Sequence, residues 1–105
     1  MIWAVEYFKE AEKDLAKFDY SQKLHILKAI EKVSQNPLPD NEGGYGKPLG
    51  NHNTARLAGY YKIKLLKLGV RIVYGLVRED EKMKIIVMSI RNDEVAYKMA
   101  GKRIR

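Results

Sequence analysis

The feature that most constrains the fold is a pair of short runs in which apolar and charged residues alternate. The first is Tyr61–Leu65, with the sequence YKIKL, and the second is Gly69–Tyr74, with the sequence GVRIVY. Such alternation predicts strands, because successive side chains of a strand point to opposite faces of a sheet. The short separation between the two runs predicts an antiparallel hairpin.

The hairpin can bury one face only in a particular register. The apolar positions are odd-numbered in the first run and even-numbered in the second, so a connection of two or four residues is needed to bring them to one side. That register sets Arg71 opposite Lys64 and leaves Lys62, Lys64 and Arg71 together on the other face. Like charges in direct opposition are unfavourable, which predicts an anion among them. The plainer interpretation is a solvated outer face.

The rest of the chain predicts one α+β domain spanning residues 1–105, in the order β-α-α-β-β-β followed by a short C-terminal helix. The N-terminal strand and a helical hairpin would pack on a small antiparallel sheet. The expected elements are a strand at 2–7, a helix at about 8–18, a helix from a cap at Asp19 or Ser21 to Asn36-Pro37, a loop at 36–54, strands at about 60–66, 70–78 and 83–90, and a helix from Asp93 to Ala100 that Gly101 would stop.

Charge is distributed unevenly along the chain. The net charge is +7, yet residues 1–42 sum to −2 and residues 43–105 to +9. A concentrated positive field favours a polyanion, most commonly nucleic acid, although an acidic protein is also possible. The sequence has no cysteine, no membrane-spanning apolar run and no export signal pattern, so we expect a cytoplasmic protein that does not associate with membranes.

Three other signals are weak. The stretch Gly43–Pro48 invites comparison with a phosphate-binding loop, but Asn41 stands where the first glycine is required and Pro48 where Ser or Thr is required. His25 and His52 fall in the second predicted helix and in the predicted loop, so we assign neither a catalytic role. Cys or His pairs with metal-ligand spacing are lacking in the sequence, and we expect neither a metal nor a cofactor.

Beside the N-terminal strand and the helical hairpin, six further parts of the chain form a recognisable series: Lys47–Leu49, Tyr61–Leu65, Gly69–Tyr74, Ile85–Ile90, Arg91 and Tyr97. Taken in order, these patterns resemble the RelE/ParE toxin superfamily over nearly the whole chain. The resemblance is closest to the RelE branch, the messenger-RNA endonucleases of toxin–antitoxin pairs. One departure is that relatives usually carry Gly-x-Arg at the end of the last strand, where this chain has Ser89-Ile90-Arg91.

The resemblance implies a metal-independent endoribonuclease with a RelE-like microbial ribonuclease fold. Its site would comprise Lys62, Lys64, Arg71, Arg91 and Tyr97. Cleavage by a 2′-hydroxyl needs a base, an acid and donors for the charge on the phosphorane. Neighbouring cations make a lysine give up its proton more readily, which favours Lys64 for proton transfer. Arg71 and Arg91 would stabilise charge, and Tyr97 would orient the nucleophile or stack on a base.

The resemblance also implies partners. In better-known relatives the messenger RNA is cut on the ribosome. Either toxin class also implies a small RelB-like antitoxin, with an acidic or amphipathic segment that would wrap the basic sheet and displace or occlude the final helix. Two alternatives remain: a ParE-like toxin that poisons DNA gyrase without cutting RNA, and a basic module whose partner is only its antitoxin. Presence of the five site residues favours the nuclease over both.

Overall fold

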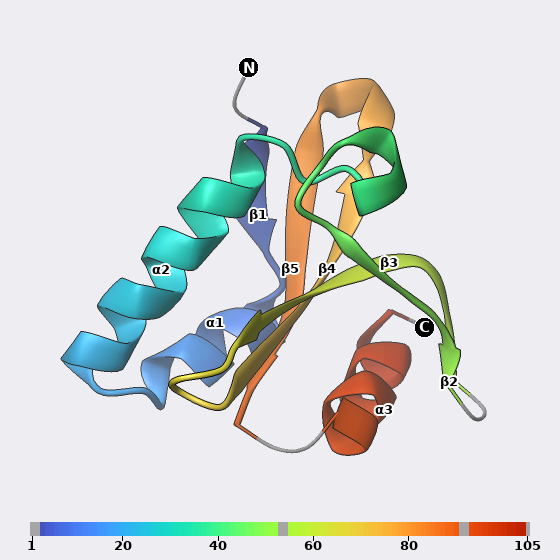
Figure 1. Cartoon of the computed structure of the whole chain (residues 1–105). Coiled ribbons are helices and arrows are strands. Elements are labelled where there is room, and N and C mark those ends of the chain that lie inside the picture. The colour runs from blue at the N-terminus through green and yellow to red at the C-terminus, as the bar shows by residue number, and fades with distance from the viewer. Residues whose placement is uncertain (1–2, 53–54, 91–92, 105) are drawn as a thin grey trace.

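The computed structural model describes residues 3–52, 55–90 and 93–104, in which two consecutive helices follow the first strand and a third helix follows the last strand (Figure 1). The strands are β1 (Ala4–Tyr7), β2 (Lys47–His52), β3 (Ala55–Leu65), β4 (Val70–Val77) and β5 (Lys82–Ser89). The helices are α1 (Lys9–Ala16), α2 (Tyr20–Ser34) and α3 (Asp93–Arg103), with short 3-10 turns η1 (Asp40–Glu42) and η2 (Arg78–Asp80). Among the described helices, none is both long and apolar enough to cross a bilayer.

The five strands form one sheet in the order β1-β5-β4-β3-β2. All neighbouring strands are antiparallel except β1 and β5, which run parallel. The chain returns from β1 to β5 only after the helical hairpin and the three-stranded meander, so a parallel neighbour is sterically allowed. The predicted fold class is therefore confirmed, with the N-terminal strand as one edge of the sheet.

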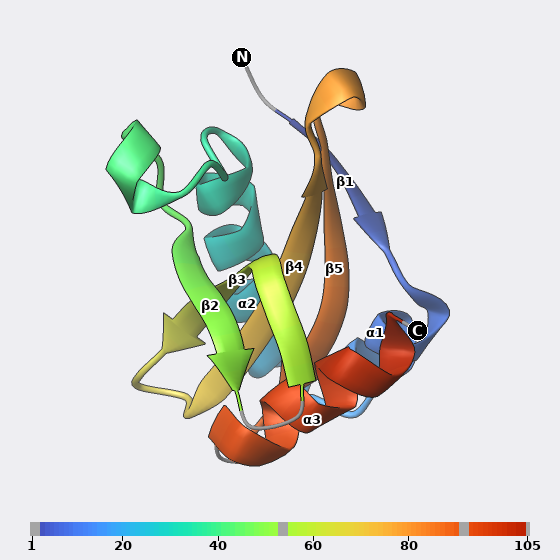
Figure 2. The same cartoon turned by 90° about the vertical axis from the view of Figure 1, so that its right-hand side faces the viewer.

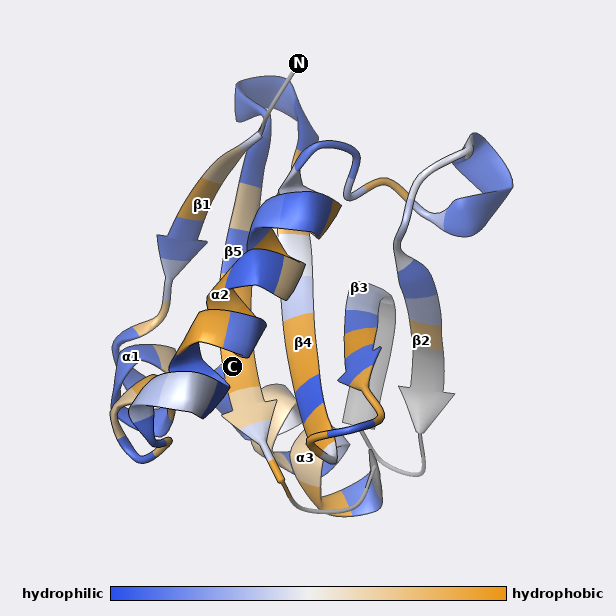
Figure 3. Ribbon diagram, turned by 60° about the vertical axis from the view of Figure 1, so that its left-hand side comes forward, coloured by the Kyte–Doolittle hydropathy of each residue, from blue (hydrophilic) through white to orange (hydrophobic). Residues whose placement is uncertain are grey.

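Helices cover both faces of the sheet. Helices α1 and α2 lie on one side and α3 crosses β3, β4 and β5 on the other (Figures 1 and 2). The side under α1 and α2 holds the larger core, which includes Ile26, Ile30, Ile63 and Ile72. Hydropathy explains why the helical hairpin of α1 and α2 packs there. Hydrophobic and hydrophilic residues alternate along α2, as in an amphipathic helix, whereas β4 and β5 are mostly hydrophobic (Figure 3).

A β-bulge in β5 places two consecutive apolar side chains on the α3 side of the sheet. The register between β4 and β5 shifts between Val73 and Tyr74, and Ile85 contributes to the core under α1 and α2. Ile86 and Val87 both contribute to the second core under α3. A bulge places two residues of one strand against one of its partner, so two consecutive side chains can face the same side.

The helical hairpin begins as the sequence predicts. The Asp19 carboxylate accepts a hydrogen bond from the Gln22 backbone N–H at 2.8 Å, and the Gln22 side chain accepts one from the Asp19 N–H at 3.0 Å. This reciprocal capping box satisfies two N–H groups that the first turn of α2 leaves without partners. The choice between Asp19 and Ser21 is thus resolved in favour of Asp19.

The expectation of a loop over 36–54 is wrong for its second half. Residues 47–52 form β2, which pairs antiparallel with β3, and β3 itself starts at Ala55 instead of near residue 60. The prolines and glycines of this segment suggested only turns. Pro48 is nevertheless compatible with β2 because this strand lies at the edge of the sheet, where a missing N–H need not break a ladder.

The first half of the segment is a tight loop that packs on its own backbone. The Asp40 N–H donates to the Gly46 carbonyl at 2.8 Å, and the Gly46 N–H donates to the Leu38 carbonyl at 2.9 Å. A side chain on Gly46 would come within 2.6 Å of the Tyr74 hydroxyl. That hydroxyl donates to the Pro37 carbonyl at 2.9 Å. The glycines serve close packing in this loop, in agreement with setting aside a phosphate-binding role.

Gly44→Ala is expected to destabilise the protein by at least about 1 kcal/mol, because the new Cβ would collide with the Leu38 backbone carbonyl. Urea unfolding would measure the change. The control is Asn41→Ala in the same loop, where the side chain is exposed and the effect should stay within about 0.5 kcal/mol. Equal stability of the two variants would contradict this account of the loop.

The end of α3 also differs from expectation, because the helix continues through Gly101 to Arg103. The Arg103 guanidinium donates to both Asp14 carboxylate oxygens at 2.7 and 3.1 Å and to the Ile86 carbonyl at 2.8 Å. Asp14 also accepts from the Met88 N–H at 3.0 Å. Strand β1 ends opposite Ile85, so beyond that point Asp14 and Arg103 provide the hydrogen-bond partners for backbone groups on the edge of β5. The bonds of Arg103 outweigh the weak helix propensity of one glycine.

Candidate functional site

The predicted hairpin register is confirmed, and it assembles the cations. Strand β3 ends at Leu65 and β4 begins at Val70, which leaves a connection of four residues. Lys64 lies opposite Arg71, as predicted, and Lys62 lies opposite Val73. Residues paired across antiparallel strands share a face, as do alternate residues of one strand. Lys62, Lys64 and Arg71 therefore stand on one face of the sheet.

That face is the one crossed by α3, and the helix brings Tyr97 to the cations. The Lys62 ammonium lies 6.0 Å from the centre of the Tyr97 ring, within the range of a cation–π contact. Tyr97 is only 2% exposed and packs with Val73, Val87 and Ala96. In this conformation the ring is an internal support for Lys62 and does not offer a free surface for a base.

Arg71 is held toward the end of the hairpin. Its guanidinium donates to the Gly69 carbonyl at 3.3 Å, and the side chain is half-buried. Gly69 has a φ of +66°, a conformation that favours glycine, so the turn that positions this carbonyl depends on the residue type. Lys64, opposite Arg71, is exposed. The site thus has one oriented planar donor beside one solvent-accessible ammonium.

The opposite face of the same hairpin provides a rigid base. Tyr61 and Tyr74 pair across β3 and β4, with ring centres 5.5 Å apart, and both side chains are buried. Burial raises the pKa of Tyr74 above its ordinary value near 10, so the ring stays neutral at physiological pH. These tyrosines belong to the core, as the alternation predicted, on the face opposite the cations.

Two residues join the site that the sequence did not assign to it. Ser89 lies opposite Arg71 on β5 and is buried, so the row Lys64, Arg71, Ser89 crosses three strands. Lys47 lies opposite Lys62 on β2 and is exposed. Lys47 was missed because its segment was interpreted as a loop. The available signal was the apolar residue Leu49 two positions later, which the structure buries as part of the same strand.

The remaining candidates are placed as follows. Arg91 lies outside the described residues, as does the side chain of His52. His25, to which no role was assigned, lines a pocket of about 460 Å³ that it shares with Lys64 and Lys67. Within residues 3–52, 55–90 and 93–104, no group of His, Cys, Asp or Glu side chains has the arrangement of a metal site.

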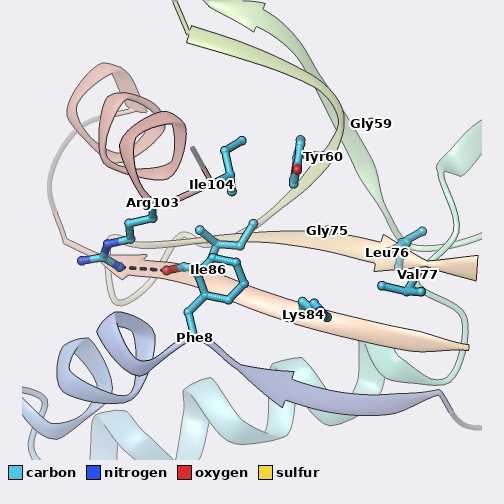
Figure 4. A pocket seen from close by; sticks show the side chains of 10 residues that line it. All are labelled: Phe8, Gly59, Tyr60, Gly75, Leu76, Val77, Lys84, Ile86, Arg103 and Ile104. Carbon is cyan, nitrogen blue, oxygen red and sulfur yellow. Dashed lines mark hydrogen bonds between the residues drawn. The ribbon is translucent and has the colours of Figure 1, made fainter. Parts of the chain in front are cut away.

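A second pocket, of about 500 Å³, lies at the other end of the α3-covered face (Figure 4). Its lining includes Tyr60, Lys84, Ile104 and Arg103, and the Arg103 guanidinium there is already bonded to the Ile86 carbonyl. Tyr60 lies against Gly75, since a Cβ on that glycine would be 2.8 Å from the tyrosine ring. The lining of this pocket does not include Lys64 or Arg71.

Comparison with known proteins fits this geometry. No family model matches the chain. A protein of Escherichia coli described as a RelE-like toxin is 27% identical over 109 residues, which cover both chains completely. The isolated Escherichia coli RelE toxin superposes with a TM-score of 0.67 at 25% identity, over 98% of this chain and 99% of that one. This chain has the RelE fold.

Two further solved structures have the same fold. A mutant of Escherichia coli RelE in the free state has a TM-score of 0.75 and 22% identity, with complete coverage of both chains. A RelBE2 toxin–antitoxin complex from Mycobacterium tuberculosis matches with a TM-score of 0.69 and 23% identity, over 87% of this chain and all of that one. The RelE-like fold that the sequence resemblance implies is therefore confirmed.

Proposed function

We propose that this protein is the toxin of a toxin–antitoxin pair and that it arrests translation by cutting messenger RNA. The observation that carries the proposal is the pairing of Lys64 with Arg71, beside Lys62, on one face of a RelE-fold sheet. Three cations gathered on one face offer several charged donors to a ribose phosphate. Similarity to a RelE-like toxin over the full chain supports the same function.

The proposed reaction is in-line attack of a ribose 2′-hydroxyl on the adjacent phosphate. A base removes the hydroxyl proton, the 2′-oxygen bonds to phosphorus, and the bond to the 5′-oxygen breaks as that oxygen is protonated. Lys64 is exposed and within reach of a bound phosphate, and it would transfer a proton. Arg71 stays charged and presents a planar fork of donors, so it would stabilise the phosphorane.

Lys62, Arg91 and Tyr97 complete the proposed site. Lys62 would contact the phosphate from the next pair of the hairpin, and Tyr97 would hold its ammonium through the ring contact at 6.0 Å. We therefore assign Tyr97 a positioning role. Arg91 would stabilise the leaving oxygen, as the resemblance to RelE toxins implies.

The natural partners would be messenger RNA on the ribosome and a RelB-like antitoxin. The net charge of +9 over residues 43–105 supports a polyanionic substrate. Solved relatives from Mycobacterium tuberculosis and Escherichia coli are complexes of RelE-type toxins with their antitoxins, which supports the second partner. An acidic or amphipathic segment would suit the basic sheet face.

Brief induction of the protein followed by primer extension on cellular transcripts would test the function. We expect discrete new 5′ ends inside coding regions within minutes, and none in cells that carry an empty vector. DNA damage with intact messages would instead indicate gyrase poisoning. Intact messages and undamaged DNA would contradict both toxin activities, whereas growth arrest by itself would not distinguish them.

A further inference from the structure

The cation cluster continues onto β2, outside the hairpin that the sequence highlighted. Lys47 and Lys62 are directly opposite in the antiparallel pairing of β2 with β3. Directly opposite side chains start about 5 Å apart and point to the same face. Lys62 is in turn two residues from Lys64, which faces Arg71. The four cations therefore form a diagonal track across β2, β3 and β4.

The charge of Lys47 is available to a ligand. Its side chain is exposed, and within the described part of the chain its ammonium makes no salt bridge. Glu94, on α3, is instead paired with Lys98 at 3.3 Å. Two lysines in direct opposition repel each other, so a bound anion between them would be stabilising.

We propose that Lys47 binds the RNA backbone at a phosphate next to the scissile one. The inference rests on the proposed nuclease function and deepens it. Strands are about 4.8 Å apart, so β2 and β4 are separated by roughly 10 Å and Lys47 and Arg71 are placed for different phosphates. Lys47 thus extends the substrate site by one position along a single strand of RNA, and its contribution is to binding and not to the chemical step.

A competing explanation exists for a lysine at this place. Strand β2 is an edge of the sheet, and exposed lysines and prolines at edges prevent pairing with another chain. Lys47 and Pro48 would fulfil that role without any RNA. Edge protection predicts that Lys47→Ala promotes association of the protein with itself and leaves RNA binding unchanged, so the two explanations differ in a measurable way.

The test is the salt dependence of RNA binding by Lys47→Ala. The probe is a short fluorescein-labelled 2′-O-methyl RNA, which cannot supply the attacking hydroxyl, and binding is followed by fluorescence anisotropy between about 50 and 200 mM salt. Loss of one phosphate contact should reduce the slope of log K against log salt by about 0.7, and weaken binding about fivefold near 0.1 M salt. The rate of cleavage at saturating substrate should not change, whereas KM should rise.

Two further variants make the result specific. Lys28→Ala removes an equal charge from the exposed side of α2, on the opposite side of the sheet, and should keep the wild-type slope. Lys47→Glu would place a carboxylate opposite Lys62, so it should melt at the same or a higher temperature while RNA binding falls further than in Lys47→Ala. Opposite changes in stability and binding exclude simple misfolding.

The outcomes separate the two proposals. If the wild-type protein binds and cuts RNA but Lys47→Ala and Lys28→Ala have equal slopes, Lys47 is not a phosphate contact and the nuclease proposal stands. If Lys47→Ala instead forms aggregates with unchanged RNA binding, edge protection is the correct explanation. If the wild-type protein neither binds nor cuts RNA, both proposals fail.

Discussion

Replacing Arg71 with alanine is expected to reduce RNA cleavage about 10²- to 10³-fold, because one preorganised donor to transition-state charge typically contributes that much. Arg71 is suited to this role because it presents a planar fork of donors, and the Gly69 carbonyl at 3.3 Å helps to orient its guanidinium. The apolar face of β4 is untouched by the change. The variant should therefore unfold at a temperature close to that of the wild-type protein.

Cleavage would be measured as the rate of appearance of defined RNA 5′ ends, with translating ribosomes present. Arg78→Ala is the matched control, because it removes the same charge at the far end of β4, roughly 23 Å away at about 3.3 Å per residue. Arg78 is bonded to Glu42 at 2.9 Å, and this exposed pair keeps the pKa of the Glu42 carboxyl below its usual range. Arg78→Ala should retain full activity.

Arg71→Lys distinguishes charge from geometry. Lysine keeps the positive charge but lacks the planar fork, so an intermediate loss of activity would indicate that Arg71 acts through paired donors. If Arg71→Ala and Arg78→Ala both cut RNA at the wild-type rate, the assignment of Arg71 to the site is wrong.

Asp14→Ala should reduce the free energy of unfolding by about 3–5 kcal/mol, the usual cost of removing one partner from a buried ion pair. The Asp14 and Arg103 side chains are 8% and 15% exposed, so solvent screens their interaction little. Asp14 also accepts a hydrogen bond from the Met88 N–H, which would lose its partner. Urea unfolding of the variant would measure the loss.

A double-mutant cycle would assign the cost to the pair. Arg103→Met alone leaves the Asp14 charge buried, whereas Asp14→Leu with Arg103→Met removes both charges and should cost much less than the sum of the single changes. Glu94→Ala disrupts an exposed pair with Lys98 on the same helix and should change stability by only about 0.5 kcal/mol or less. A cost for Asp14→Ala as small as that of Glu94→Ala would show that α3 is held by its apolar contacts alone.

The Asp14–Arg103 ion pair also connects the stability of the fold to the position of the cation cluster. Asp14 and Arg103 join α1 to the end of α3, and α3 brings Tyr97 against Lys62. Loosening the end of α3 should therefore lower cleavage further than global unfolding explains, through loss of the support for Lys62.

Much of the fold and part of the site followed from local pattern. The apolar alternation of β3 and β4 required an even connection, and that requirement alone set Lys64 opposite Arg71. The capping box at Asp19 and Gln22 marked the start of α2 in the same way. These features were predictable because each depends on residues within a few positions of one another, where side-chain periodicity and capping chemistry decide the structure.

Other features depend on pairings between segments that are distant in the sequence. Strand β2 forms because residues 47–52 pair with β3. The proline and the glycine of this segment, taken alone, indicate only turns. Helix α3 passes Gly101 because Asp14, far away in sequence, binds Arg103, and Tyr97 is buried because α3 covers Val73 and Val87. The alternation along each strand was enough to predict which residues face the core and which cations share a face. The packing of remote elements brings Lys47 opposite Lys62 and the Tyr97 ring against it, because such contacts depend on the whole core and not on neighbours along the chain.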